Sequence, residues 1–360
     1  MSWRTALPIW SIALPFLGLA LVLANVAKTG VVGTVIAGVV LIGSVIAAVH
    51  HAEVVAHRVG EPFGTLVLAV AVTVIEVSLI VSLMLSGGPD ASTLARDTVF
   101  AAIMIILNGI VGICLLVGGM RHLEQRFTLR GASAALSVLA AMAILSLVLP
   151  NYVTSAPGPE LARPQLIFLA IVSLVLYGVF VMVQTVRHRD YFLPEEEPPS
   201  HDTHADPPDD SATWIAFGIL LVALVAVVFL AKGLASTVEN AVRSAGLPLA
   251  VVGIIIAAVV LAPESLAALN AARRNRIQTS LNLALGSALA TIGLTIPTVA
   301  VISILLGIPL SLGMDPKSMT LLGLSLFIAT LTLGTGRTTV LQGTVHLVIF
   351  ATYLFITIIP

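Results

Sequence analysis

Charged residues are scarce in this chain of 360 residues: only 10% are Asp, Glu, Lys or Arg, whereas 58% are hydrophobic. A soluble domain carries about 25% charged and about 45–50% apolar residues, so a soluble protein of this size would lack the charges that cover a surface. Disordered chains are excluded too, because they are polar. The composition therefore indicates an integral membrane protein.

Cysteine and net charge are also nearly absent. The single cysteine, Cys114, lies in an apolar run, which excludes a disulfide framework and a cysteine-held metal cluster. A formal net charge of −1 leaves no basic field for nucleic acid. The glycine-rich stretch Gly334–Thr339 lacks the Lys-Ser/Thr pair of a nucleotide-binding loop and is predicted to be a turn. We expect no nucleic-acid partner, no resident cofactor and no enzymatic activity.

Long apolar runs are what the chain has instead. About eleven reach the roughly 20 residues that cross a bilayer as a helix. The alternation of apolar and polar residues that is typical of a membrane β-barrel is absent. The sequence therefore predicts an all-α integral membrane protein of about eleven transmembrane helices, near residues 8–27, 30–49, 64–86, 98–120, 131–149, 164–186, 213–231, 247–270, 279–306, 318–334 and 338–359.

Lysine and arginine predict the orientation of these helices. With the N-terminus on one side, that side collects 11 of the 17 basic residues and the other side collects 6. Because cytoplasmic loops are richer in Lys and Arg, we expect a cytoplasmic N-terminus. An odd number of spans then places the C-terminus outside.

One long polar stretch divides the chain. Residues 188–211 include Glu195, Glu196 and Glu197 together with several aspartates and prolines, a composition typical of a disordered acidic linker. We expect this linker to be cytoplasmic. The predicted domains are a leading helix (1–29), a five-helix bundle (30–187), the linker (188–211) and a second five-helix bundle (212–360).

Two carboxylates lie inside apolar runs rather than in loops. About 12 residues of apolar helix precede Glu76, which at 1.5 Å per residue puts it about 18 Å deep, near the middle of the bilayer. Glu264 follows Pro263 in the eighth run. A charge at that depth costs about 2.5–3.5 kcal/mol on insertion scales. Such residues mark functional sites, so we predict that both glutamates bind ions.

The segments that contain the two glutamates resemble each other. The glutamate follows a Gly-x-Pro start by 16 residues in one segment and by 18 in the other, and a run with unusual polar residues comes next. Five spans separate the third helix from the eighth, so the two copies are inverted. Inverted repeats with a site at the bilayer midplane are typical of secondary transporters. The sequence thus predicts one leading helix and two inverted five-helix repeats.

The two segments also point to a known family. GEPFGTLVLAVAVTVIEVSLI and LAPESLAALNAARRNRIQTSLNLALGSALATIGLTIP closely resemble the two α-repeats of bacterial ChaA-type cation/proton antiporters, relatives of the CAX exchangers in the cation/calcium exchanger superfamily. The resemblance implies a multi-pass protein of the bacterial inner membrane. It implies that Glu76 and Glu264 bind cation and proton, with Asn108 and Ser287 lining the same site. The chain departs from the wider pattern in lacking a Gly-Asn pair before each glutamate.

The expected function is exchange of Ca²⁺ for H⁺ by alternating access. Ca²⁺ takes 6–8 oxygen ligands, and protons compete for the same carboxylates. The expected oxygens come from Glu76, Glu264, Thr73, Asn108, Asn282, Ser287 and carbonyls freed where Pro263 interrupts its helix. Each polar residue other than the glutamates has an alternative role as a hydrogen bond between helices. The alternatives are a Na⁺ or K⁺/H⁺ antiporter of the same architecture and a passive cation channel. The oligomeric state stays open.

Several histidines and charged residues are further candidates for a functional or structural role. His50, Glu53 and His57 share one helical face at the cytoplasmic end of the second span, where they either modulate transport with pH or form a solvated helix end. His346, inside the last run, is expected to bond to another helix, with a proton relay as the alternative. Lastly, we expect a short interfacial helix to hold Lys232, Glu239 and Arg243.

Overall fold

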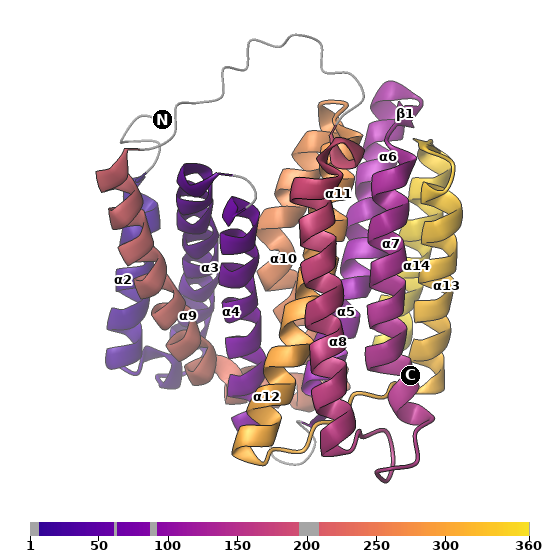
Figure 1. Ribbon diagram of the computed structural model, residues 1–360. Helices are drawn as coiled ribbons and strands as arrows, with labels where there is room; N and C mark the ends of the chain where they lie inside the picture. Colours follow the sequence, from indigo (N-terminus) through magenta and orange to yellow (C-terminus); the bar gives the residue numbers. More distant parts are fainter. Residues whose placement is uncertain (1–6, 61–62, 87–91, 194–208, 360) are drawn as a thin grey trace. The chain divides into compact units, whose positions relative to one another are not determined.

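The computed structural model describes residues 7–60, 63–86, 92–193 and 209–359, and these residues form helices at every predicted span (Figure 1). Nine of the described helices are long and apolar enough to cross a membrane, and two further apolar helices, Ile9–Leu23 and Val67–Ser82, are shorter. The all-α membrane fold of about eleven helices is therefore confirmed. Most of the predicted acidic linker lies outside the described residues.

The helices group into two compact units. The first unit consists of residues 1–91 and 197–246, and the second consists of residues 92–196 and 247–360. Each unit therefore combines helices from both halves of the sequence. These units are defined by which helices pack together. The predicted domains are instead consecutive stretches of sequence, with boundaries at residues 29, 187 and 211, and those boundaries stay a prediction.

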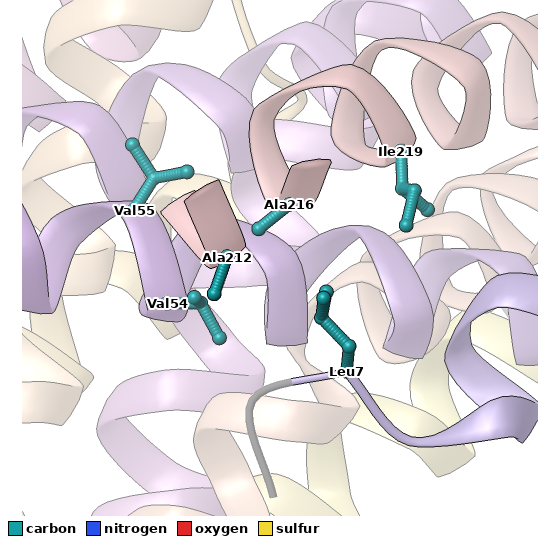
Figure 2. Packing of buried hydrophobic residues seen from close by; sticks show 6 residues of the cluster. All are labelled: Leu7, Val54, Val55, Ala212, Ala216 and Ile219. Atoms are coloured by element: carbon teal, nitrogen blue, oxygen red, sulfur yellow. The ribbon is translucent and has the colours of Figure 1, made fainter. Parts of the chain in front are cut away.

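The first unit is a packed group of helices with small residues at their contacts. Figure 2 shows how Ala212 and Ala216 lie between larger side chains such as Val54 and Leu7 in one buried cluster. Alanines let neighbouring helices approach closely, which is how helices pack in a membrane. The described elements of this unit are α2 (Ile9–Leu23), η1 (Val26–Lys28), α3 (Val31–Val59), α4 (Phe63–Ser86) and α9 (Asp210–Ser244).

The helix α9 corrects one expectation. It runs without a break for 35 residues from its N-cap at Asp209, whose Oδ1 accepts a hydrogen bond from the Ala212 amide at 2.9 Å. The predicted separate interfacial helix is wrong, because Lys232, Glu239 and Arg243 all lie on α9. Gly233, next to Lys232, is only a weak break, since a glycine costs about 1 kcal/mol inside a helix. The Glu239–Arg243 ion pair at 3.1 Å stabilises a later turn of the same helix.

The second unit contains the remaining spans. Several of them are assembled from an α-helix and a π-helical or 3₁₀ turn. The described elements are α5 (Leu94–Met104), η3 (Ile105–Ile110), α6 (Val111–His122), β1 (Gln125–Arg126), α7 (Leu129–Ala143), η4 (Ile144–Val148), η5 (Leu149–Asn151), α8 (Arg163–Met182), η6 (Val183–Arg187), η7 (Arg189–Phe192), α10 (Ala250–Arg273), α11 (Ile277–Ala290), η8 (Thr291–Thr295), α12 (Ile296–Leu306), α13 (Pro316–Leu333), β2 (Arg337–Thr338) and α14 (Val340–Ile358).

A π-helical turn interrupts the third helix of each predicted repeat. In the first repeat η3 separates α5 from α6, and in the second repeat η8 separates α11 from α12. Each turn begins or contains a polar residue singled out from the sequence, Asn108 in η3 and Thr291 in η8. π-Helical turns are rare and occur frequently at functional sites. The matching positions of the two turns direct attention to this pair of spans.

Two short features connect the helices of this unit. The strands β1 and β2 pair antiparallel, with Gln125 opposite Thr338, next to the predicted turn between α13 and α14. Gly336 in that turn has φ of 68°, a left-handed conformation that glycine adopts without strain. The turn prediction for Gly334–Thr339 is thus confirmed.

The helix α10 corrects a second expectation, because it continues through Pro263 to Arg273 without interruption. Proline has no amide hydrogen, so the carbonyl of Val259, four residues earlier, receives no bond from it. The predicted break is therefore wrong. What the proline leaves is a regular helix with one carbonyl that lacks its usual intrahelical donor.

Candidate functional site

The centre of the candidate site is a hydrogen bond between two predicted site residues. Ser287 donates from Oγ to Oε2 of Glu264 at 2.6 Å, and both side chains are half-buried. A hydrogen bond to a carboxylate is shorter and stronger than one between neutral groups. The structure therefore brings together two of the residues that the sequence assigned to ion binding.

The local fold explains why these two residues meet. The helix α10 ends at Arg273 and α11 begins at Ile277, so the two helices form a hairpin. Asn275 makes the tight turn with a left-handed φ of 60°, a conformation that asparagine tolerates better than most residues. Glu264 lies nine residues before the end of α10, and Ser287 lies ten after the start of α11. Nearly equal distances from the turn place them side by side.

Tyr177 of α8 is a further neighbour that the sequence analysis missed. Its side chain is buried and lies within electrostatic range of Glu264. The close packing of η8 holds it there, since a Cβ on Gly293 would lie 2.6 Å from the Cβ of Tyr177. Its position in the sequence could have indicated this role, because it is a lone tyrosine inside an apolar run and a buried tyrosine hydroxyl usually has a hydrogen-bond partner.

Asn108 is fully buried and joins three helices of the second unit. Its Nδ2 donates to Ser325 Oγ at 2.8 Å, and its Oδ1 lies 3.0 Å from His346 Nδ1. Beyond the histidine, Nε2 lies 3.2 Å from the hydroxyl oxygen of Thr332. The prediction that His346 bonds to another helix is confirmed. Ser325 and Thr332 were not predicted. The partner of Ser325 lies 217 positions earlier in the sequence, and the contact of Thr332 with His346 depends on how α13 packs against α14.

Asn282, another predicted site residue, has other partners. Its Nδ2 donates to the carbonyl of Phe192 at 2.6 Å, and its Oδ1 accepts from Gln278 Nε2 at 3.0 Å. These bonds attach α11 to the turn η7. The structure therefore joins Glu264 with Ser287, whereas Asn108 and Asn282 bond elsewhere within the same unit.

Glu76 and Thr73 belong to the first unit. Both lie on α4, three residues apart and so on one helical face. Glu76 is buried, with 2% of its surface exposed, and Thr73 donates to the carbonyl of Ala69 at 2.8 Å. Glu76 and Glu264 thus lie in different compact units, and a site that the two glutamates share stays a prediction.

The histidine cluster of α3 is divided between environments. The ring of His50 lies 5.6 Å from Trp10 and 5.4 Å from His51, whereas Glu53 and His57 are exposed. His51, which was not among the predicted residues, is fully buried, and its Nε2 lies 3.2 Å from the carbonyl oxygen of Ser11. A pH-modulating role for His50, Glu53 and His57 stays a prediction.

The chemistry available around Glu264 suits hard cations. Its carboxylate and the Ser287 hydroxyl both offer oxygen, the ligand atom of Na⁺, K⁺ and Ca²⁺. No soft donor takes part, and within the described residues no group of three or more His, Cys, Asp and Glu gathers into a metal cluster. The arrangement can hold a cation or a proton on the same carboxylate.

Comparison with known proteins assigns the chain to a family. The family model described as sodium/calcium exchanger protein matches residues 29–186 and 215–359. Those two stretches correspond to the helices from α3 to α8 and from α9 to α14. The match therefore covers both halves of the chain.

Curated relatives are similar along most of the chain. The chain is 52% identical to the y4hA protein of Sinorhizobium fredii, over 98% of this chain and 97% of that one. It is 39% identical to the sodium-potassium/proton antiporter ChaA of Escherichia coli, over 87% and 85%. It is 27% identical to the Ca²⁺/H⁺ antiporter of Aphanothece halophytica, over 84% and 83%.

Solved structures share the fold. The structure of native YfkE matches with a TM-score of 0.75 at 17% identity, covering 97% of this chain and all of that one. The crystal structure of the H⁺/Ca²⁺ exchanger CAX matches with a TM-score of 0.72 at 15% identity, covering 96% of this chain and 87% of that one. The arrangement of helices is therefore that of membrane exchangers.

Proposed function

The chain belongs to the sodium/calcium exchanger protein family, and we propose that it is a secondary cation/proton antiporter that exchanges Ca²⁺ for H⁺. The observation that carries the proposal is the Glu264–Ser287 pair, a half-buried carboxylate inside an apolar span with a hydroxyl at 2.6 Å. A membrane protein retains such a carboxylate at a cost of about 2.5–3.5 kcal/mol on insertion scales, and it does so at ion pathways. In this proposal the protein transports ions, has no enzymatic activity and uses no resident cofactor.

The proposed mechanism is competition at carboxylates. When Glu264 is ionised, its oxygens and the Ser287 hydroxyl bind the cation, and when it is protonated it carries the proton instead. Because the two loads exclude each other, each passage across the membrane carries one of them. Glu76 is proposed as the second carboxylate, with Thr73 beside it on α4. A divalent ion needs both charges, which is why two glutamates suit Ca²⁺.

The second candidate function is exchange of Na⁺ or K⁺ for H⁺. The observation in its favour is the 39% identity to an antiporter named for sodium, potassium and protons, against 27% to one named for calcium. Asn282 favours it as well, because its amide is bonded to Phe192 and Gln278 rather than to Glu264 or Ser287. A monovalent ion needs fewer ligands than the 6–8 oxygens of Ca²⁺.

The proposed location is a bacterial inner membrane, with multiple passes through the bilayer. The bacterial relatives that match most of the chain support this location. The excess of basic residues on one side supports a cytoplasmic N-terminus and linker, with the C-terminus outside.

Everted membrane vesicles test the function. A pH gradient is imposed, and Ca²⁺, Na⁺ and K⁺ are added separately while a dye reports the gradient. We expect Ca²⁺ to collapse the gradient with the wild-type protein, and we expect E264Q to abolish that response, since an amide keeps the shape but not the charge. Collapse by Na⁺ or K⁺ alone would select the second candidate.

The matched control is E239Q. Glu239 lies near the end of α9 and pairs with Arg243 of the same helix, so the same chemical change there should leave exchange intact. Substantial exchange by E264Q would contradict the proposed site. Cation flux without any coupled proton movement would instead identify a passive channel.

A further inference from the structure

A continuous chain of four buried polar groups joins η3, α13 and α14 next to the helices of the candidate site. Its members are Ser325 of α13, Asn108 of η3, His346 of α14 and Thr332 of α13, and at most 5% of each is exposed. The four groups are linked in that order by contacts of 2.8, 3.0 and 3.2 Å. Buried polar networks of this kind are stabilising only when every member has its partner.

The contacts favour one placement of the hydrogens in this chain. Asn108 Oδ1 only accepts hydrogen bonds, so the hydrogen between it and His346 belongs to the Nδ1 of the histidine. A neutral His346 then has a bare Nε2, which accepts from the Thr332 hydroxyl. At the other end the Ser325 hydroxyl accepts from Asn108 and donates to the carbonyl of Leu321 at 2.7 Å. Together these contacts favour the tautomer of His346 that has its hydrogen on Nδ1, and the backbone of Leu107, next to Asn108, is a further hydrogen-bond neighbour of the ring.

Close packing keeps the histidine against this span. A Cβ on Gly112 of α6 would lie 3.0 Å from the Cβ of His346, and a Cβ on Gly343 of α14 would lie 2.8 Å from the carbonyl oxygen of Gly112. The two glycines let α6 and α14 approach closely, as small residues do between membrane helices. His346 therefore contacts the span that contains η3 directly.

The π-helical turn η3 connects this network with the carboxylate. It contacts α10 and α11, the helices that carry Glu264 and Ser287. A π-helical turn is rare and occurs mostly as a single turn inside an α-helix, frequently at a functional site. Asn108, inside the turn, is held by His346 and Ser325.

We propose that His346 is a positioning residue for cation exchange, which holds η3 against α10 and α11 by donating from Nδ1 to Asn108. The inference rests on the proposed function and adds a residue to it. Asn108, expected from the sequence to be a cation ligand, then acts as the link between the histidine and the turn. Loss of the donated bond leaves a buried carbonyl oxygen without its donor and weakens cation binding at Glu264.

Three substitutions of His346 distinguish the effect of losing the Nδ1 hydrogen-bond donor from the effect of losing the imidazole ring. In H346N the amide nitrogen replaces Nδ1 and keeps the donor, in H346Q the amide reaches the position of Nε2 instead, and H346L keeps neither. We expect the apparent KM for the cation to rise about tenfold in H346Q and H346L, since an unsatisfied buried acceptor costs about that factor or more. H346N should stay within about twofold of the wild type.

The control for these variants is T344V. Thr344 lies on the same helix, is exposed, and donates from its hydroxyl to the carbonyl of Val340 within α14. It should exchange like the wild type. Wild-type KM values in H346Q and H346L would overturn the inference, as would a loss in H346N equal to that in H346L.

A spectroscopic measurement tests the inference without transport. In ¹⁵N-histidine NMR of the wild-type protein, with the signal assigned by its absence in H346N, we expect a neutral imidazole protonated at Nδ1. Protonation at Nε2 alone would overturn the inference even if transport is normal. If the wild-type protein exchanges no cation, the proposed function fails while the NMR result still decides the tautomer.

Discussion

At the scale of single residues, the proposed function depends on the oxygens around one carboxylate. Glu264 receives a hydrogen bond from Ser287 at 2.6 Å and has Tyr177 within electrostatic range. The carboxylate was evident from the sequence because an acid in an apolar run is expensive. Tyr177 was not, because its proximity arises from α8 packing against η8, a contact between residues more than a hundred positions apart.

The first prediction concerns the partner of that carboxylate. S287A should raise the apparent KM for the transported cation about tenfold or more, because a hydrogen bond to a charged group contributes about 1.5–3 kcal/mol. S287T, which retains the hydroxyl, should lose less. Transport in everted vesicles over a cation series measures both values.

The control for this residue is S137A. Ser137 is exposed on α7 and bonds to the carbonyl of Ala134 in its own helix, so its removal should not alter KM. An S287A protein with wild-type KM would show that the hydroxyl has no part in binding the cation.

At the scale of elements, the spans around the candidate site contain π-helical turns, and two of the helices there are in close contact through glycines. The turns η3 and η8 occupy matching positions in the two predicted repeats. Apolar periodicity does not distinguish an α-helix from one that contains a π turn, so the sequence could not predict them. The sequence also could not predict that α6 and α14 lie in close contact at Gly112 and Gly343.

The second prediction compares two glycines of neighbouring helices. G343A should lower the melting temperature, because its Cβ would lie 2.8 Å from the carbonyl oxygen of Gly112 and the helices have to separate. Overpacking of this kind costs about 1–3 kcal/mol. Thermal unfolding of the purified protein in detergent measures the shift.

The matched substitution is G323A on α13. A Cβ there meets nothing within 4 Å, and alanine favours a helix over glycine by about 1 kcal/mol, so this variant should be as stable as the wild type or more stable. Equal melting temperatures for G343A and G323A would contradict the close contact between α6 and α14.

At the scale of the whole molecule, the sequence predicts the number and limits of the helices well. Each of the eleven predicted runs coincides with a helix. The reason is that a helix needs about 20 mostly apolar residues to cross a bilayer, and runs of that length can be recognised in the sequence. Two local expectations were wrong: α9 is not divided before its end, and α10 is not broken at Pro263. In both cases packing of the whole helix outweighs a local preference of glycine or proline.

The candidate site could be predicted only in part for a related reason. Glu264 and Ser287 were found because they are polar residues of consecutive spans joined by a tight turn. The bond between His346 and Asn108 joins residues 238 positions apart, and its formation depends on tertiary packing. Sequence reasoning identified both residues but not their partnership.

The most direct test of the account is equilibrium binding of Ca²⁺ and Na⁺ to the purified protein across a pH series. The central claim is that cation and proton share carboxylate oxygens, so each bound proton removes a ligand that the cation needs. By linkage, each then weakens the binding of the other equally. Calorimetry on the wild type should show cation affinity falling as pH falls, more steeply for Ca²⁺ than for Na⁺, and E264Q should lose this dependence together with most of the affinity. A cation affinity that stays flat across the series would show that protons and cations use different sites, and it would contradict the account.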